Sequence, residues 1–141
     1  MQIVDANVLI NAVNRNAADH EVARDWLERA LVGGRTLGFA WVAIVAFLRI
    51  ATNPAALSDP LDPELAVRSV EGWLSEEASV VVDPISSHLA ILQRLLLESD
   101  VTGNLVNDAH LAALAIEYGA TVVSFDSDFA RFDGIDWERP E

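Results

Sequence analysis

Short apolar segments alternate with longer amphipathic segments along the chain, and this alternation restricts the fold more than any other feature. The short segments have the length of strands, whereas the longer ones repeat their apolar residues every three or four positions, as helices do. Parallel strands need a crossover between them, which is usually a helix. The sequence therefore predicts an α/β protein with a central parallel sheet. The predicted strands are 2–4, 36–39, 79–82, 121–125 and a weak one near Ile135, and the predicted helices after a first one near Val8 are 20–32, 41–50, 64–74, 85–98 and 106–118.

The amount of apolar material predicts one domain. Apolar and aromatic residues make up 52% of the 141 positions, enough for one core at a length where roughly two-thirds of the unfolded surface is buried. No repeat, low-complexity tract or long linker divides the chain, so we expect a single domain over residues 1–141. The longest apolar run, 39–48, is shorter than the about 20 residues of a membrane span. The N-terminus lacks a signal-peptide pattern, and we expect a cytoplasmic protein.

The charge and the missing residue types limit which ligands the chain can bind. It has 22 Asp and Glu against nine basic residues, all Arg, for a net charge of -13. Such a balance argues against a broad basic surface for nucleic acid. The absence of Cys excludes disulfides and thiolate metal sites, and His20, His88 and His110 are far apart in the sequence. Any bound metal should therefore be a hard ion held by oxygen, Mg²⁺ or Mn²⁺.

Four aspartates are placed where a merely solvated acid is not expected. Asp5 and Asp126 each follow a predicted strand directly, and the carboxyl ends of parallel strands are where open α/β sheets bind ligands. Asp108 shares the apolar stripe of its predicted helix, and Asp128 comes two residues after Asp126. Carboxylates brought together raise one another's pKa unless a cation neutralises them. The pattern thus favours a divalent-metal site, which attracts a phosphodiester despite the net charge and hydrolyses it.

Each of these aspartates also has a purely structural interpretation. Asp5 could cap the following helix by accepting from the amide of Val8. Asp108 could complement a helix dipole, although Asn107 could cap the same helix without placing a charge on the inner face. Asp128 could cap a short turn at residues 129–131, which is the slightly favoured interpretation for that residue.

Three motifs together resemble a known family. They are Ile3–Leu9 (IVDANVL), Asn107–Ala115 (NDAHLAALA) and Ser124–Phe129 (SFDSDF). In this order and at these separations they are similar to the PIN-domain ribonucleases, and more narrowly to the VapC toxins of bacterial toxin–antitoxin pairs. The resemblance covers essentially the whole chain. It implies a three-layer α/β/α domain, a Mg²⁺-dependent endoribonuclease activity, commonly on transfer or ribosomal RNA, and a cognate antitoxin that blocks the site.

The resemblance also implies roles for individual residues. Asp5, Asp108 and Asp126 would be the metal-binding carboxylates, and Asp128 a further ligand or a group that positions water. Asn7 and Ser124 would orient ligands or substrate, with local backbone capping as the alternative for both.

The buried third helix departs from the family pattern. The family usually carries a Glu there, but Ala46 stands at the corresponding position and no acid occurs between Glu28 and Asp59. The segment 47–54 resembles a subgroup of these toxins that also lacks the Glu. Arg49 in this helix is expected either to reach a phosphate or the carboxylate cluster, or to form a buried ion pair. The four Trp residues are expected in the core or at an interface rather than as platforms for bases.

An acidic surface with an acidic cleft also predicts a basic partner. An Arg-rich peptide, such as a basic C-terminal segment of an antitoxin, would be steered there electrostatically. The apolar face of the early helices is expected to support a homodimer.

Two other functions remain open. One is a catalytically weak or silent PIN-like module that binds RNA or an antitoxin, which Ala46 favours. The other is phosphoryl chemistry of the receiver or haloacid-dehalogenase type, which the lack of any Lys argues against.

Overall fold

A five-stranded parallel sheet forms the centre of the molecule. The structure is a computed structural model that describes residues 1–141. The strand order is β3-β2-β1-β4-β5, and every neighbouring pair is parallel. This confirms the predicted α/β class with a parallel sheet. The strands are β1 (Gln2–Val4), β2 (Leu37–Ala40), β3 (Ser79–Val82), β4 (Thr121–Val123) and β5 (Asp136–Glu138).

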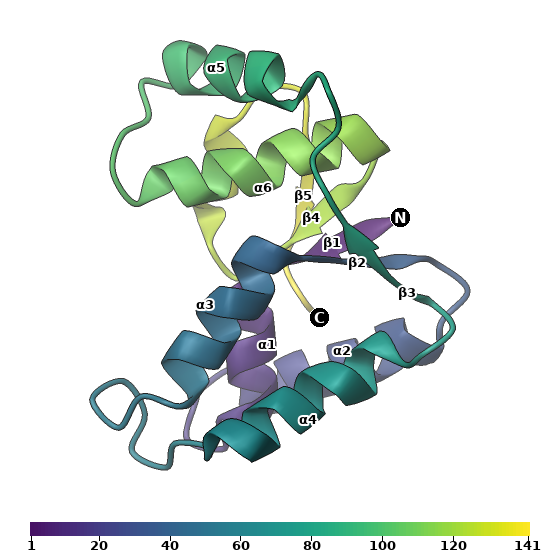
Figure 1. Ribbon diagram of the computed structural model, residues 1–141, viewed down its shortest axis with the longest axis vertical. Helices are drawn as coiled ribbons and strands as arrows, with labels where there is room; N and C mark the ends of the chain where they lie inside the picture. The colour runs from purple at the N-terminus through teal and green to yellow at the C-terminus, as the bar shows by residue number, and fades with distance from the viewer.

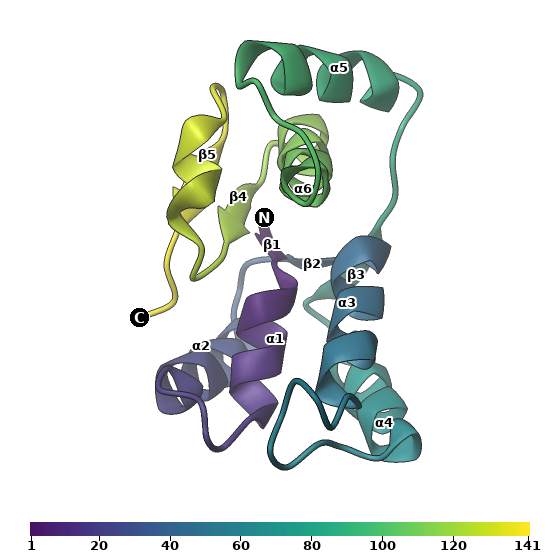
Figure 2. The same ribbon diagram turned by 90° about the vertical axis from the view of Figure 1, so that its left-hand side faces the viewer.

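Helices cover both faces of the sheet and complete three layers (Figures 1 and 2). Alternate residues of one strand point to opposite faces, so Ile3 joins one core and Val4 the other. Four helices pack on the Val4 face: α1 (Ala6–Val13), α2 (His20–Val32), α3 (Trp41–Ala51) and α4 (Pro63–Leu74). The Ile3 face is covered by α5 (His88–Glu98), α6 (Leu105–Tyr118) and the short 3₁₀ helix η1 (Ser127–Arg131).

Two predicted elements are shorter than expected, each for a local reason. The helix predicted from residue 85 begins at His88, because the amide of His88 closes a turn on the carbonyl of Ile85 at 3.0 Å. The strand predicted to residue 125 ends at Val123. There the amide of Phe125 donates to the side chain of Asn7 at 3.1 Å instead of to a neighbouring strand. None of the helices combines the length and apolar character that crossing a bilayer requires.

The strand order places a topological switch point between β1 and β4. From β1 the chain builds outward through β2 to β3, and then returns to the other side of β1 to add β4 and β5. Loops that leave a switch point in opposite directions open a crevice at the carboxyl ends of the strands. Residues that follow Val4 and Val123 are therefore adjacent, although 119 positions separate Asp5 from Ser124.

Candidate metal and substrate site

Asp5 lies directly after β1 and is held by three hydrogen bonds. Its Oδ1 accepts from the amide of Ala6 at 2.7 Å. Its Oδ2 accepts from the Ser124 hydroxyl at 2.7 Å and from Asn7 Nδ2 at 2.9 Å. Burial raises the pKa of Asp5, and the bonds from Ser124 and Ala6 oppose that rise. Asp5 does cap α1, but through Ala6 rather than through the expected amide of Val8, whose partner is the Asp5 carbonyl.

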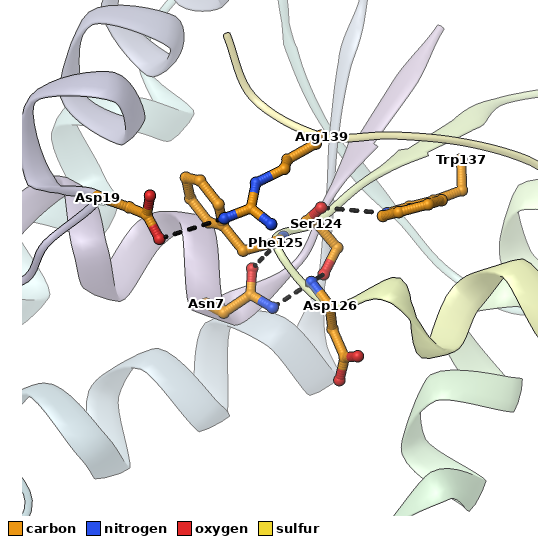
Figure 3. Close-up of polar contacts among 7 residues, drawn as sticks. All are labelled: Asn7, Asp19, Ser124, Phe125, Asp126, Trp137 and Arg139. Atoms are coloured by element: carbon orange, nitrogen blue, oxygen red, sulfur yellow. Dashed lines mark hydrogen bonds and ion pairs between the residues drawn. The ribbon is translucent and has the colours of Figure 1, made fainter.

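Ser124 is the centre of this network. Its side chain is completely buried. Besides donating to Asp5, its hydroxyl oxygen accepts from Asn7 Nδ2 at 2.8 Å and from the amide of Asp126 at 3.0 Å (Figure 3). Asn7 also accepts from the amide of Phe125, so it ties the start of α1 to the end of β4. Asn7 and Ser124 thus orient Asp5 and also fix local backbone, which combines both interpretations of these residues.

Asp126, not Asp128, caps the short helix η1. The Oδ1 of Asp126 accepts from the amide of Asp128 at 2.8 Å, which leaves its second carboxylate oxygen without a hydrogen bond. The expectation that Asp128 caps this turn is wrong, because Asp128 already lies inside the first turn. Its carboxylate instead pairs with Arg131 at 2.9 Å, and both side chains are partly exposed.

Asp108 faces the other aspartates from the first turn of α6, without any hydrogen-bond partner. Helix α6 begins at Leu105 with Asn104 as its N-cap, so Asn107 does not cap it as expected. Burial raises the pKa of Asp108 to about 6, and the charges of Asp5, Asp126 and Asp128 add to the rise, while Arg131 opposes it. The four predicted aspartates therefore share one electrostatic environment.

The donor set has the chemistry that a hard divalent ion requires. All its donors are carboxylate oxygens, as Mg²⁺ and Mn²⁺ prefer, and the charges of three of them add to the burial that raises the pKa of Asp108. The structure does not bring three His, Asp or Glu side chains to the spacing of a metal site. The residues thus fit a hard metal ion in donor type but do not form a preassembled set of ligands.

A pocket of about 540 Å³ opens beside Asp5 and Asp108. Helix α3 forms its opposite wall and contributes Ala46, so no acid stands at the position where the family carries Glu. Arg49 lines the same pocket, is exposed and makes no ion pair or hydrogen bond, which excludes the buried ion pair that was one expectation. Asn7, Ser124, Asp126 and Asp128 do not line it.

Two features of the site were missed at the sequence level. Trp41 lines the pocket and is 54% exposed, so it does not belong to the core. The second feature is a support behind the loop at 124–126, where Trp137 Nε1 donates to the Ser124 carbonyl at 3.1 Å. Arg139 adds to it by lying over the Phe125 ring at 5.1 Å from its centroid and by pairing with Asp19 (Figure 3). The sequence gives no sign of either feature. An exposed Trp at the start of a helix has the same local pattern as a buried one, and a polar contact from a weak last strand has no pattern of its own.

A second polar cluster lies apart from the aspartates, between α5 and α6. His88 Nε2 and His110 Nδ1 are 2.8 Å apart, and His88 Nδ1 is 3.0 Å from Glu117 Oε2. These His residues, far apart in the sequence, are thus in contact. Burial, together with the charge of His88, lowers the pKa of His110.

Comparisons with known proteins agree with this architecture. The family model described as "PIN domain" matches residues 3–135. Ribonuclease VapC37 of Mycobacterium tuberculosis is 48% identical over 140 residues, which are 99% of this chain and 97% of that protein. Ribonuclease VapC48 of the same species is 36% identical over 93% of this chain and 91% of its own length.

Solved structures show the same fold at low sequence identity. VapBC2 from Rickettsia felis, bound to a fragment of its promoter DNA, matches with a TM-score of 0.74 and 19% identity, over 99% of this chain and 98% of that one. VapC20 of M. tuberculosis, a toxin that cleaves the sarcin–ricin loop, matches with a TM-score of 0.70 and 15% identity, over 92% and 93%. By sequence and by fold, this chain belongs to the PIN-domain family, within its VapC branch.

Proposed function

We propose that this chain is a Mg²⁺-dependent, or Mn²⁺-dependent, endoribonuclease and the toxin of a toxin–antitoxin pair. The observation that carries the proposal is that Asp5, Asp126 and Asp128 all act electrostatically on Asp108 beside the switch point of a PIN-domain sheet. Relatives of 34% to 48% identity are named VapC ribonucleases, which supports RNA cleavage. The cleavage of the sarcin–ricin loop by VapC20 supports a structured RNA, ribosomal or transfer RNA, as substrate.

In this proposal Asp5, Asp108 and Asp126 hold the metal, and Asp128 adds a ligand or positions a water. A bound divalent ion would supply an activated water and neutralise the charge that develops on the phosphate. Ser124 and Asn7 keep both ends of the Asp5 carboxylate in place before any ligand arrives. Asp108 has no such restraint, and its pKa of about 6 leaves it ionised at neutral pH and free to turn toward a cation.

Arg49 supplies the direct cationic contact to phosphate. It is the only basic side chain that lines the pocket, and it has no competing partner in the protein. An unpaired guanidinium on the wall opposite the aspartates is suited to a bidentate contact with phosphate oxygens. Ala46 leaves space in that wall, so in this chain a carboxylate from α3 does not take part.

The same charges fit an antitoxin with a basic C-terminal segment. A protein of net charge -13 with unneutralised aspartates in a cleft attracts a cationic peptide. Several solved structures of this fold are VapBC assemblies, some bound to DNA, which supports such a partner. We further propose that the chain forms a homodimer and acts in the cytoplasm.

Cleavage of RNA by the purified protein tests the proposal. Wild type should cut RNA when Mg²⁺ is added and stop on addition of the antitoxin, whereas Asp5→Ala and Asp108→Ala should be at least about 100-fold slower, beyond the effect of losing an outer-shell partner. Asp59→Ala, which removes an exposed acid without a side-chain hydrogen bond or ion pair, is the matched control and should keep full activity.

Equal activity in wild type and both site variants would refute the proposal. It would favour a silent PIN-like module that only binds RNA or an antitoxin, a function that Ala46 and the open spacing of the carboxylates also allow. Titration calorimetry with Mn²⁺ separates the two, because the silent module would bind no metal.

A further inference from the structure

The pocket beside Asp5 and Asp108 has two unlike walls. One wall is polar and comes from the end of β1 and the start of α6, with Asp5, Asp108, Asn104 and Asn107. The other wall is the exposed side of α3 and is apolar except for Arg49 at its far end. The volume of about 540 Å³ lies in the range of small-molecule sites. The metal chemistry proposed above uses the carboxylates and leaves the apolar wall unexplained.

The α3 wall is a row of side chains along one face of that helix, two apolar and one cationic. Trp41, Val45 and Arg49 are separated by four residues each, so they lie on the same side of the helix. With a rise of 1.5 Å per residue, the row spans about 12 Å. Trp41 is 54% exposed and Val45 55% exposed, and the indole N–H of Trp41 has no partner in the protein. Trp41 therefore presents a large aromatic face to solvent beside the aspartates of the pocket.

The polar wall offers two free amides opposite this face. Asn104 is the N-cap residue of α6 but makes no side-chain capping bond. Asn107 is exposed, and its side chain also has no hydrogen-bond partner in the protein. Side-chain amides carry both donors and acceptors, which match the edges of nucleobases. The pocket thus combines a flat apolar surface with unpaired amide groups and a cation.

We propose that this pocket binds a nucleobase of the RNA substrate beside the scissile phosphate, with the base stacked on the Trp41 indole. This inference rests on the proposed ribonuclease function and adds a base-recognition residue to it. The base edge meets the amides of Asn104 and Asn107, and the adjoining phosphate meets Arg49. Recognition of unpaired bases by stacking on aromatic side chains is the usual mode for single-stranded RNA.

The combination of an aromatic face, unpaired amides and one cation favours a nucleotide over a protein occupant. A peptide side chain or a second copy of this chain would cover Trp41 and Val45 but would leave the amides opposite to be satisfied separately. A nucleotide carries the base for the indole, the polar edge for the amides and the phosphate for Arg49 in one unit. Its phosphate also lies next to the carboxylates that would hold the metal, so the pocket selects a nucleotide at the position where cleavage is proposed.

Kinetics with a single-stranded RNA whose cut position has been mapped test the inference. Trp41→Ala should raise KM about 10-fold to 100-fold, the range of base–aromatic stacking, while kcat stays near the wild-type value. Trp41→Phe should recover most of the loss because it keeps an aromatic face. Leu89→Ala removes an apolar side chain that is more exposed than Trp41, 75% exposed on α5, and should change nothing. With an RNA that is abasic beside the cut, wild type and Trp41→Ala should give the same KM, since the partner of the indole is gone.

Fluorescence gives an answer that does not depend on cleavage. Binding of the same RNA should quench tryptophan emission in wild type, and the quenching should be largely lost in Trp41→Phe. If wild type cuts RNA and Trp41→Ala has an unchanged KM, the base pocket is refuted while the nuclease remains. A Trp41→Ala protein that binds RNA normally but no longer self-associates, or no longer binds the antitoxin, would assign this face to a protein partner and overturn the inference. Quenching without any cleavage by wild type would support the base pocket and refute the nuclease.

Discussion

The strand-end half of the site and its helix half differ in how firmly the fold holds their polar groups. In the strand-end half, Asp5 is tied to Ser124, to Asn7 and to the backbone of Ala6. In the helix half, Asp108 has no hydrogen bond, and Arg49 on the facing wall of α3 has none either. One half of the site is thus built during folding. The other half is left for ligands to complete.

This difference has an energetic meaning. Asp5 belongs to a hydrogen-bonded network, so its removal leaves donors of the folded protein without an acceptor, even though burial raises its pKa. A carboxylate that faces other carboxylates without such bonds destabilises the metal-free protein, and a cation that binds only the folded state reverses that cost. Substitutions in the two halves should therefore have opposite effects on stability, although both reduce activity.

Removal of the Asp5 carboxylate should give the largest loss of stability. Asp5→Ala deletes the cap of α1 and leaves the buried Ser124 hydroxyl without its acceptor, while Asn7 Nδ2 keeps its bond to Ser124. We expect this to cost about 2 kcal/mol of unfolding free energy. Asp5→Asn, which keeps an oxygen for Ala6, should lose less. Urea unfolding of the metal-free proteins measures both. A wild-type midpoint in Asp5→Ala would mean that the network does not hold the two strands together.

Removal of the Ser124 hydroxyl should act on the metal rather than on the chemistry itself. Ser124→Ala leaves Asp5 in place but without one of its orienting bonds, and loss of an outer-shell partner typically lowers metal affinity or activity about 10- to 100-fold. Calorimetric titration with Mn²⁺, alongside cleavage rates, measures this loss. Ser69→Ala, whose hydroxyl donates only to a carbonyl of α4, is the control. An unchanged Mn²⁺ affinity would show that the strand-end half does not need its network.

The smallest expected effect is a pH dependence that comes from Asp108. Its pKa of about 6 in the folded protein lies above the ordinary value of 3.8. Between these values the folded state binds more protons than the unfolded state, so stability falls as pH rises from about 4 to about 7. Asp108→Asn should remove much of this slope and stabilise the metal-free protein at neutral pH by about 1 kcal/mol, a modest figure because the group keeps contact with solvent.

Denaturant unfolding with a chelator, at several pH values, measures that slope. The exposed acid substitution Asp59→Asn should leave it unchanged. Burial also raises the pKa of Asp5, which acts in the same direction, so a residual slope should persist in Asp108→Asn. If stability depended on pH equally in wild type and in Asp108→Asn, Asp108 would not be the group that destabilises the metal-free protein at neutral pH.

The sequence predicted the aspartates of the site better than the residues around them. Asp5, Asp108 and Asp126 were identifiable because a charge directly after an apolar strand, or on an apolar stripe, contradicts the local pattern. The exposure of Trp41 was not predictable, since an indole in an apolar run has the same pattern whether or not another element covers it. The contact between His88 and His110 depends on how α5 packs against α6, which periodicity within each helix does not encode.

Two local predictions near the site were wrong because a side chain, and not the backbone, accepts the hydrogen bond of a backbone amide. The strand that was expected to include Phe125 ends earlier because the Asn7 side chain takes the Phe125 amide. The capping role expected for Asp128 falls to Asp126, two residues earlier. In both cases a polar side chain from the site competes with regular structure. These two deviations lie at the candidate site, whereas the late start of α5 at His88 comes from a backbone turn outside it.

Because β1 pairs with β4, the site can form only after the ribosome has synthesised almost the whole chain. Asp5 is made almost at once, but its partner Ser124 follows 119 residues later, and Trp137, which holds the Ser124 carbonyl, later still. At the usual speed of synthesis this interval is roughly 6 to 24 s. For most of that time the growing chain carries Asp5 with its neighbours Ala6 and Asn7 but without Ser124, and Asp108 is added shortly before Ser124. A ribosome therefore makes this protein without exposing an assembled carboxylate site beside its own RNA until the last strands have emerged and joined the sheet.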